Sequence, residues 1–140
     1  MSKLLDLRRR IDAREARIGV IGLGYVGLPL AVGLANAGFR VNGFDIDVKK
    51  IRSLAQGRSY IGDVDSKAVA KLVESKQFTP TNDFNLLAEV DVINICVPTP
   101  LRKTKDPDLS YVVSAVEMIA AHVRPGQLII LESTTYPGTT

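Results

Sequence analysis

The stretch RIGVIGLGYVG at residues 17–27 determines the expected fold. Residues 17–22 form a short apolar run rich in β-branched side chains, which is typical of a strand buried on both faces of a sheet. Residues 22–27, GLGYVG, match the pattern G-x-G-x-x-G and follow this strand directly, at the start of a predicted helix. Strand, glycine loop and helix in this order are typical of a dinucleotide-binding unit.

Each glycine of this loop has an expected task. Gly22 allows the tight turn, Gly24 lets the backbone approach a pyrophosphate, and Gly27 lets the helix lie close to the sheet. The N–H groups at the start of the helix then face the pyrophosphate, where the helix dipole favours negative charge.

An acidic residue follows at the spacing that such a unit needs. Asp45 stands 23 residues after Gly22, at the end of the second predicted strand. At this place a carboxylate accepts hydrogen bonds from the adenosine ribose hydroxyls. The alternative is a plain strand-to-helix turn with a solvated acid at a strand end. The complete order of strand, glycine loop, helix, strand and acid favours the cofactor site.

The rest of the chain continues the alternation of strands and helices. We therefore expect an α/β fold of the Rossmann type, a doubly wound parallel sheet with helices on both faces, preceded by a short N-terminal helix. Asp47 is interpreted as a helix N-cap, and Asp108 or Ser110 as the cap of the last helix. The expected strands are 17–22, 40–45, 78–81, 91–97 and a buried strand 128–132; the expected helices are 25–37, 47–56, 66–76 and 110–123.

The expected domains are a helical leader at residues 1–16 and an NAD-binding Rossmann domain at residues 17–140. In the leader, Leu4, Leu7 and Ile11 recur at helical spacing, which favours a helix docked on the domain over a partner-binding arm. Residues 1–17 carry six basic and three acidic side chains, so they hold the whole net charge of +3. A nucleic-acid binder usually spreads a basic face over its fold, so no nucleic-acid partner is expected.

Composition narrows the class further. Hydrophobic residues make up 46% and charged residues 24% of 140 residues, as in an ordinary globular domain of about this size. No apolar run approaches the roughly 18 residues of a membrane span, and no secretory signal is visible. A cytoplasmic protein without a membrane partner is expected. One cysteine and one histidine make a disulfide framework and a metal site improbable.

Two later strand ends carry further candidate groups, because ligands bind at the carboxyl ends of parallel strands. Val97 and the rigid corner Pro98-Thr99-Pro100 could line the ribose and nicotinamide side of a cofactor. The stretch ESTTYPGTT at 132–140 gathers hydroxyls beside a carboxylate, although such loops also serve only turn hydrogen bonds. Lys50 is open between a contact to the adenosine ribose or phosphate and a solvated side chain. Cys96 is interpreted as a buried core residue and not as a nucleophile.

As a set, these motifs resemble the UDP-glucose/GDP-mannose dehydrogenase family. Within it, the resemblance is closest to the UDP-N-acetylglucosamine 6-dehydrogenases and extends over essentially the whole chain. The segments that carry it are LLDLRRRIDAREARIG (4–19), IGVIGLGYVGLPLA (18–31), VNGFDID (41–47), GRSYIGDV (57–64), INICVPTPL (93–101), DPDLSYV (106–112) and LIILESTTYPGTT (128–140).

The resemblance implies an activity in polysaccharide biosynthesis. Such enzymes oxidise the 6-hydroxymethyl group of a UDP-sugar to a carboxylate in two NAD-dependent steps, through a thioester on a cysteine. It also implies that a central helix and a C-terminal domain supply the catalytic cysteine and most sugar contacts, and that the full enzyme forms a homo-oligomer through that helix. Cys96 does not match the catalytic cysteine.

The resemblance also implies roles for individual residues. The loop from Gly22 to Gly27, with backbone contacts from Leu23, Tyr25 and Val26, holds the pyrophosphate. Asp45 matches the ribose acid, and Lys50 stands where relatives often have arginine. The family's remaining cofactor contacts match Val97, Pro98, Thr99, Ser133 and Thr134, and Thr134 also helps to position the reacting water.

The chain lacks the later parts of the family pattern, so we expect an isolated cofactor domain that binds NAD but oxidises no sugar nucleotide. Two alternatives stay open. One is a stand-alone NAD-binding or sensing module. The other is the N-terminal domain of a hydroxyacid or 6-phosphogluconate dehydrogenase, against which Pro98-Thr99-Pro100 and Ser133-Thr134 argue.

Overall fold

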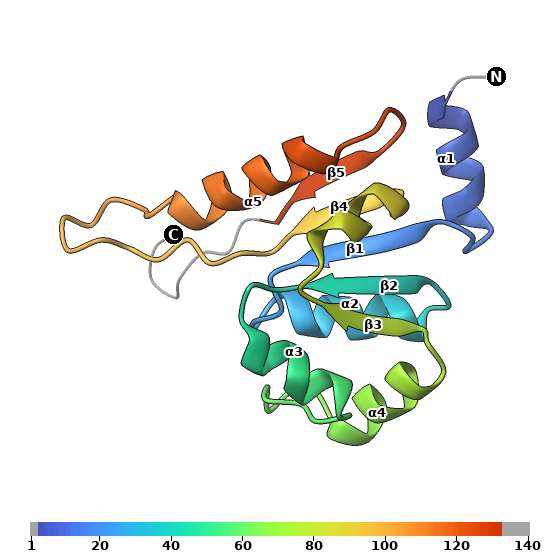
Figure 1. Cartoon of the computed structure of the whole chain (residues 1–140), viewed down its shortest axis with the longest axis horizontal. Helices are drawn as coiled ribbons and strands as arrows, with labels where there is room; N and C mark the ends of the chain where they lie inside the picture. Colours follow the sequence, from blue (N-terminus) through green and yellow to red (C-terminus); the bar gives the residue numbers. More distant parts are fainter. Residues whose placement is uncertain (1–2, 133–140) are drawn as a thin grey trace.

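The computed structural model describes residues 3–132 and shows five parallel strands covered by helices (Figure 1). The bounds are α1 Lys3–Asp12, β1 Arg17–Ile21, α2 Gly27–Asn36, β2 Arg40–Phe44, α3 Val48–Ala55, α4 Ser66–Glu74, β3 Phe78–Thr81, the 3₁₀ helix η1 Phe84–Glu89, β4 Val92–Ile95, α5 Ser110–His122 and β5 Leu128–Leu131. Within this part of the chain, no helix combines the length and the apolar character that crossing a membrane requires.

The strand order in the sheet is β3-β2-β1-β4-β5. β1 lies at the centre and pairs with β2 on one side and with β4 on the other. This order is the one found in doubly wound nucleotide-binding sheets, in which the direction of winding reverses beside β1. It confirms the predicted fold class and places the carboxyl ends of β1, β2 and β4 together.

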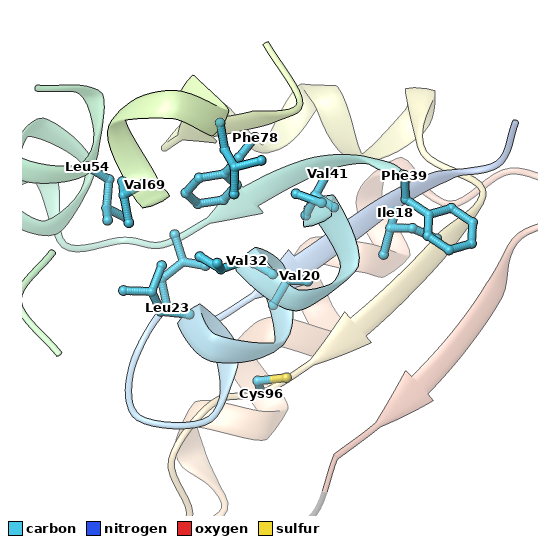
Figure 2. Packing of buried hydrophobic residues seen from close by; sticks show 14 of the residues in the cluster. Ile18, Val20, Leu23, Val32, Phe39, Val41, Leu54, Val69, Phe78 and Cys96 are labelled. Carbon is cyan, nitrogen blue, oxygen red and sulfur yellow. The ribbon is translucent and has the colours of Figure 1, made fainter. Parts of the chain in front are cut away.

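Side chains alternate along the strands and so feed two separate cores. One core, called the main core below, lies between the sheet and α2, α3 and α4, and Figure 2 shows part of its packing. It includes Val20, Val41, Leu54 and Phe78, all essentially without solvent exposure. The second core lies on the opposite face, where strand residues such as Ile93 pack with η1 and with the inner side of α5. The sheet is therefore covered on both faces, as the apolar character of β1 and β4 predicts.

β5 is less buried than predicted. The sequence 128–132 predicted a buried strand, but Leu128, Ile129 and Leu131 are exposed. The reason is that β5 is an edge strand and that Ala115 and Ile119, the buried residues of α5, belong to the core over β4 and η1. Only Ile130 packs against the main core.

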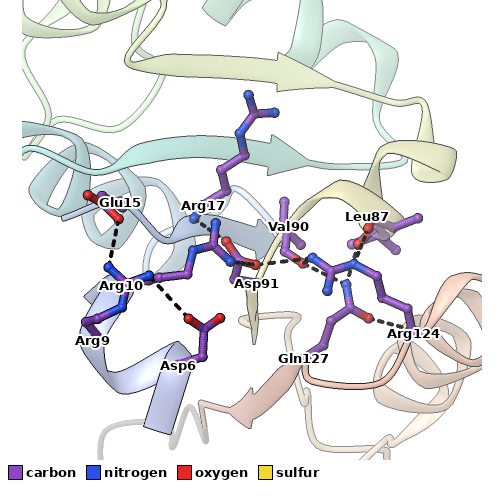
Figure 3. A network of polar contacts seen from close by, with 11 residues as sticks. Asp6, Arg9, Arg10, Glu15, Arg17, Leu87, Val90, Asp91, Arg124 and Gln127 are labelled. Atoms are coloured by element: carbon purple, nitrogen blue, oxygen red, sulfur yellow. Dashed lines mark hydrogen bonds and ion pairs between the residues drawn. The ribbon is translucent and has the colours of Figure 1, made fainter. Parts of the chain in front are cut away.

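The predicted leader forms α1, which lies at the end of the sheet where the strands begin (Figure 1). Leu7 is buried in the main core, while Leu4 is exposed. Arg10 of α1 donates to the buried Asp91 at 2.7 Å, and Arg124 reaches the same carboxylate oxygen at 3.2 Å (Figure 3). Ile11 also packs against the main core, so the helix is docked on the domain by the apolar contacts of Leu7 and Ile11 and by the ionic contact of Arg10. The division of the chain at residues 16 and 17 stays a prediction.

The predicted N-cap residue is found in α3 but not in α5. Asp47 caps α3 by accepting a hydrogen bond from the Lys49 N–H, as predicted. In α5 neither Asp108 nor Ser110 is the cap residue; Leu109 is, and it forms no side-chain cap bond. Asp108 still accepts a hydrogen bond from the Ser110 N–H, because its short side chain folds back on the first turn.

Candidate functional site

The glycine loop connects β1 to α2 at the carboxyl end of the sheet. Gly22 has a φ of +94°, a left-handed conformation that favours glycine, and a Cβ there would come within 2.9 Å of the Cys96 backbone. At Gly27 a Cβ would lie 1.6 Å from the Gly22 carbonyl oxygen, so α2 can approach the loop only because this residue is glycine. The packing of the protein itself therefore explains why both positions are glycine.

Gly24 is different, because the protein itself does not require it. A Cβ built on Gly24 meets no atom of residues 3–132 within 4 Å, and the φ of Gly24 is not in the left-handed region. A side chain at this position would project into open space beside the loop. The predicted close approach of a ligand to the Gly24 backbone gives a reason for glycine that the packing does not give.

The start of α2 also offers unpaired hydrogen-bond donors. α3 and α4 are capped by aspartates, whereas α2 begins after Val26 without a side-chain cap. Within residues 3–132, the N–H groups of Gly24, Tyr25 and Val26 donate to no other group. Such groups at a helix N-terminus are suited to bind phosphate oxygens.

Asp45 lies beside this loop and is fixed by two backbone bonds. One carboxylate oxygen accepts from the Leu23 N–H and the other from the Asp47 N–H, each at 2.9 Å. The residue is only 9% exposed, which excludes the alternative of a solvated strand end. Each oxygen retains a lone pair, so the carboxylate can still accept a bond from a ribose hydroxyl.

A cleft of about 990 Å³ joins these groups. It runs along the carboxyl ends of β1, β2 and β4. Its lining includes ten of the residues predicted to bind a cofactor: Gly22, Leu23, Gly24, Tyr25, Val26, Asp45, Lys50, Val97, Pro98 and Thr99. Gly27 is outside the lining, because it packs under the loop against Gly22. Ser133 and Thr134 lie outside the described residues.

One wall of the cleft, formed by α5, was not predicted from the sequence. α5 contributes Ser110, Ser114 and Met118, which recur every four residues and so share one face of the helix, and Tyr111 and Phe84 complete this side. The four-residue spacing of these side chains could have indicated a shared helix face. The sequence does not show that this face lines the cleft, because a long loop that begins at Pro98 precedes α5.

Lys50 lines the cleft from α3, and its Nζ lies 5.8 Å from the centre of the Tyr60 ring. The sequence left open whether Lys50 contacts the cofactor or is only solvated. Its position at the cleft, with the side chain against an aromatic face, favours the cofactor contact. A cation there can meet the adenosine ribose or a phosphate. That contact stays a prediction.

Cys96 is buried in the main core, as predicted. Burial, with a smaller contribution from the charge of Glu132, raises the pKa of its thiol to about 11. A thiol with this pKa is protonated at neutral pH and is not a nucleophile. In the part of the chain that is described, no three His, Cys, Asp or Glu side chains are grouped so that they could hold a metal ion.

The comparison with known families decides which cofactor this arrangement serves. Residues 16–140 match the NAD-binding domain of the UDP-glucose/GDP-mannose dehydrogenase family. The chain belongs to this family. Its glycine loop, Asp45 and cleft are therefore parts of an NAD-binding domain. The open space beside Gly24 and the N–H groups of Gly24, Tyr25 and Val26, which have no acceptor within residues 3–132, fit the pyrophosphate of NAD.

Similar proteins include dehydrogenases of nucleotide sugars. The chain is 39% identical to a UDP-N-acetyl-D-glucosamine 6-dehydrogenase of Pseudomonas aeruginosa, covering 91% of this chain and 29% of that protein. It is 42% identical to a UDP-N-acetyl-D-mannosamine dehydrogenase of Methanococcus maripaludis, covering 89% and 30%. A solved structure of an NDP-N-acetyl-D-galactosaminuronic acid dehydrogenase from Methanosarcina mazei is 35% identical, with a TM-score of 0.80 over all of this chain and 32% of that one. The chain spans about 30% of the length of these two curated relatives.

Asp45 predicts a preference of this domain for NAD over NADP. A 2′-phosphate would meet the fixed carboxylate, and two like charges about 4 Å apart repel by roughly 1–4 kcal/mol, depending on the local dielectric. Lys49 and Lys50 weaken this repulsion, so we expect NADH to bind at least a few-fold more tightly than NADPH, without excluding NADPH. Fluorescence titration with both nucleotides measures the ratio.

The matched variant is Asp45→Asn, which keeps an oxygen acceptor but removes the charge. It should bind both nucleotides more weakly, because the Leu23 N–H loses a charged partner, and it should bring their affinities closer together. Equal affinity of the wild-type domain for NADH and NADPH would contradict the role given to Asp45.

Proposed function

We propose that this chain is the NAD-binding part of a nucleotide-sugar 6-dehydrogenase. The full enzyme would oxidise the 6-hydroxymethyl group of a UDP-sugar to a carboxylate in two NAD-dependent steps, with UDP-N-acetylglucosamine as the first candidate substrate. The observation that carries the proposal is the cleft in which N–H groups of the glycine loop, without an acceptor in the described part of the chain, lie beside Asp45. The names of the relatives supply the substrate class.

Within this proposal, each part of the chain has a defined task. The N–H groups of Gly24, Tyr25 and Val26 bind the pyrophosphate, Asp45 binds the adenosine ribose, and Lys50 meets the ribose or a phosphate. Thr99, Ser133 and Thr134 contact the nicotinamide side, with Val97 and Pro98 shaping the wall. Bound NAD supplies the hydride acceptor; the chain's residues hold and orient it.

The exposed edge of the sheet supports a role within a longer protein. β5 leaves Leu128, Ile129 and Leu131 exposed, and the neighbouring helix α5 exposes Val113 and Val116. An exposed apolar edge strand is a site for pairing with further chain, and natural proteins usually cover it. This favours a domain of a larger enzyme over a stand-alone sensing module.

Residues 1–140 by themselves are expected to bind NAD without oxidising any sugar nucleotide. The second oxidation requires a thiolate that captures the aldehyde. The chain's single cysteine, Cys96, is buried, and its pKa is raised to about 11. Hydride transfer also requires a sugar carbon held about 3–3.5 Å from the nicotinamide, which is the task of a substrate domain.

The experiment measures NADH formation with UDP-N-acetylglucosamine, UDP-N-acetylmannosamine and UDP-glucose. It compares the 140-residue chain with a protein in which a relative's central helix and C-terminal domain follow Thr140. The fusion should turn over one of the sugars and the short chain none. Turnover by the short chain would mean that catalytic groups lie within residues 1–140. NADH binding by the short chain is measured in parallel, since its absence would remove the proposal altogether.

A further inference from the structure

The peptide groups of the glycine loop are held from two sides through Leu23. Its N–H donates to Asp45 at 2.9 Å, and its carbonyl oxygen accepts a hydrogen bond of 2.5 Å from the Tyr60 hydroxyl. Tyr60 comes from the loop between α3 and α4, 37 residues further along the chain, and it does not line the cleft. It therefore touches the loop from outside the cofactor site.

This contact sets the direction of a donor that faces the cofactor. The Leu23 carbonyl and the Gly24 N–H belong to one planar trans peptide, so they point in opposite directions. Holding the carbonyl toward Tyr60 turns the Gly24 N–H away from Tyr60. Gly24 lines the cleft, and its N–H has no acceptor within residues 3–132.

We propose that Tyr60 is a positioning residue for NAD: its hydroxyl fixes the Leu23–Gly24 peptide so that the Gly24 N–H is oriented for the pyrophosphate before the cofactor arrives. This inference rests on the NAD-binding assignment of the cleft. It assigns a task to the segment GRSYIGDV, which resembles the family but to which the sequence analysis gave no role.

The loop around Tyr60 is itself held in place. The Ser59 N–H donates to the Ser66 hydroxyl at 2.9 Å, and the Ser59 hydroxyl donates to the Ile61 carbonyl at 2.9 Å. Ile61 is buried in the main core. Tyr60 is thus directed at Leu23 by a loop that is anchored independently of the cofactor, as a positioning residue requires.

The hydroxyl of Tyr60 also stays a donor over the working range of pH. Burial raises its pKa well above the ordinary value for tyrosine, and the negative charges of Asp45 and Asp47 raise it further. The phenol therefore does not ionise near neutral pH. The same ring supports Lys50, so Tyr60 contacts both a backbone group and a side chain of the site.

Tyr60→Phe removes the hydroxyl and keeps the ring under Lys50. We expect the affinity for NADH to fall about threefold to tenfold, the range of one lost hydrogen bond. The affinity for adenosine, which has no pyrophosphate, should not change. NADH binding is measured by fluorescence titration and adenosine binding by chemical-shift titration, both below the melting temperatures of the variants.

Ser75→Ala is the matched control, because the Ser75 hydroxyl also donates to a leucine carbonyl, that of Leu72 at 3.1 Å, but this bond lies at the end of α4 and away from the cleft. It should lower the melting temperature about as much as Tyr60→Phe does, while its affinity for NADH stays at the wild-type value. Wild-type NADH affinity in Tyr60→Phe, equal losses in both variants, or an equal loss of adenosine affinity would each overturn the positioning role. A wild-type chain that binds no NADH would overturn the NAD-binding assignment as well.

Discussion

A Gly24→Val variant of this domain is expected to lose at least about a hundredfold in NAD affinity while its melting temperature stays close to that of the wild type. The reason is the open space beside Gly24. Among the described residues, no atom lies within 4 Å of a Cβ built at this position, and the φ of Gly24 does not require glycine. The valine therefore fits the free protein but occupies the volume that the pyrophosphate needs. NADH titration and thermal unfolding of the same sample measure the two effects.

Gly27→Ala is the matched control with the opposite expectation. Its Cβ would lie 1.6 Å from the Gly22 carbonyl oxygen, so either the loop or α2 must move. Overpacking of this kind typically costs about 1–3 kcal/mol of folding stability. The melting temperature should fall clearly. If Gly24→Val bound NADH normally, or if it destabilised the domain as much as Gly27→Ala, the assignment of the phosphate loop would be wrong.

The glycine loop could be predicted from the sequence because the residue pattern that identifies it is local. Gly22, Gly24 and Gly27 lie within six residues, and the strand before them and helix after them follow from short-range periodicity. Asp45 is further away, but the length of one helix and one strand fixes its position. The structure brings these residues to one cleft as predicted. Their individual contacts with NAD remain predictions.

Other parts of the site depend on contacts that no local pattern reveals. Tyr60 contacts Leu23, which is 37 residues away in the chain. The face of α5 that carries Ser110, Ser114 and Met118 lines the cleft only because of where the tertiary fold places this helix. The misjudged burial of β5 has a related cause. An apolar run indicates that a strand is covered somewhere, but it does not show which segment covers it.

Asp91 is the strongest example of a non-local contact. On the sequence it stands only at the start of an apolar strand. In the structure it accepts hydrogen bonds from Arg10, Arg124 and the Arg17 N–H (Figure 3). Arg10 lies 81 residues away in the chain. This network joins α1, β1 and the segment between α5 and β5 at the end of the sheet opposite the glycine loop.

Asp91→Ala is expected to lower the free energy of unfolding by about 2–3 kcal/mol, which is a large part of a typical domain's stability. The Asp91 side chain is only 4% exposed, and its removal leaves the Arg17 N–H without its acceptor. The loss stays below that of a fully buried ion pair, because the Arg10 and Arg124 side chains are 32% and 41% exposed and can turn to water. Denaturant unfolding measures the loss. Affinity for NADH should not change, since the network lies away from the cleft.

Asp6→Ala is the control for a surface pair. Asp6 contacts Arg9 on the outside of α1, where the side chains are 51% and 61% exposed. Such a pair contributes little, so this variant should unfold within about 0.5 kcal/mol of the wild type. An equal loss in the two variants would show that the Asp91 network has no special weight.

The contribution of Asp91 should also depend on pH in a defined direction. Burial acts to raise its pKa, but the Arg17 N–H and the two arginines lower it more, so the folded-state pKa lies below the ordinary value. A depressed carboxyl pKa gives stability that is complete above the unfolded-state value of about 3.9 and is lost as the pH falls through the folded-state value. The difference in unfolding free energy between the wild type and Asp91→Asn should therefore be constant near neutral pH and shrink below about pH 4. A difference that stayed the same down to pH 3 would mean that the ionised carboxylate does not hold α1 to the sheet.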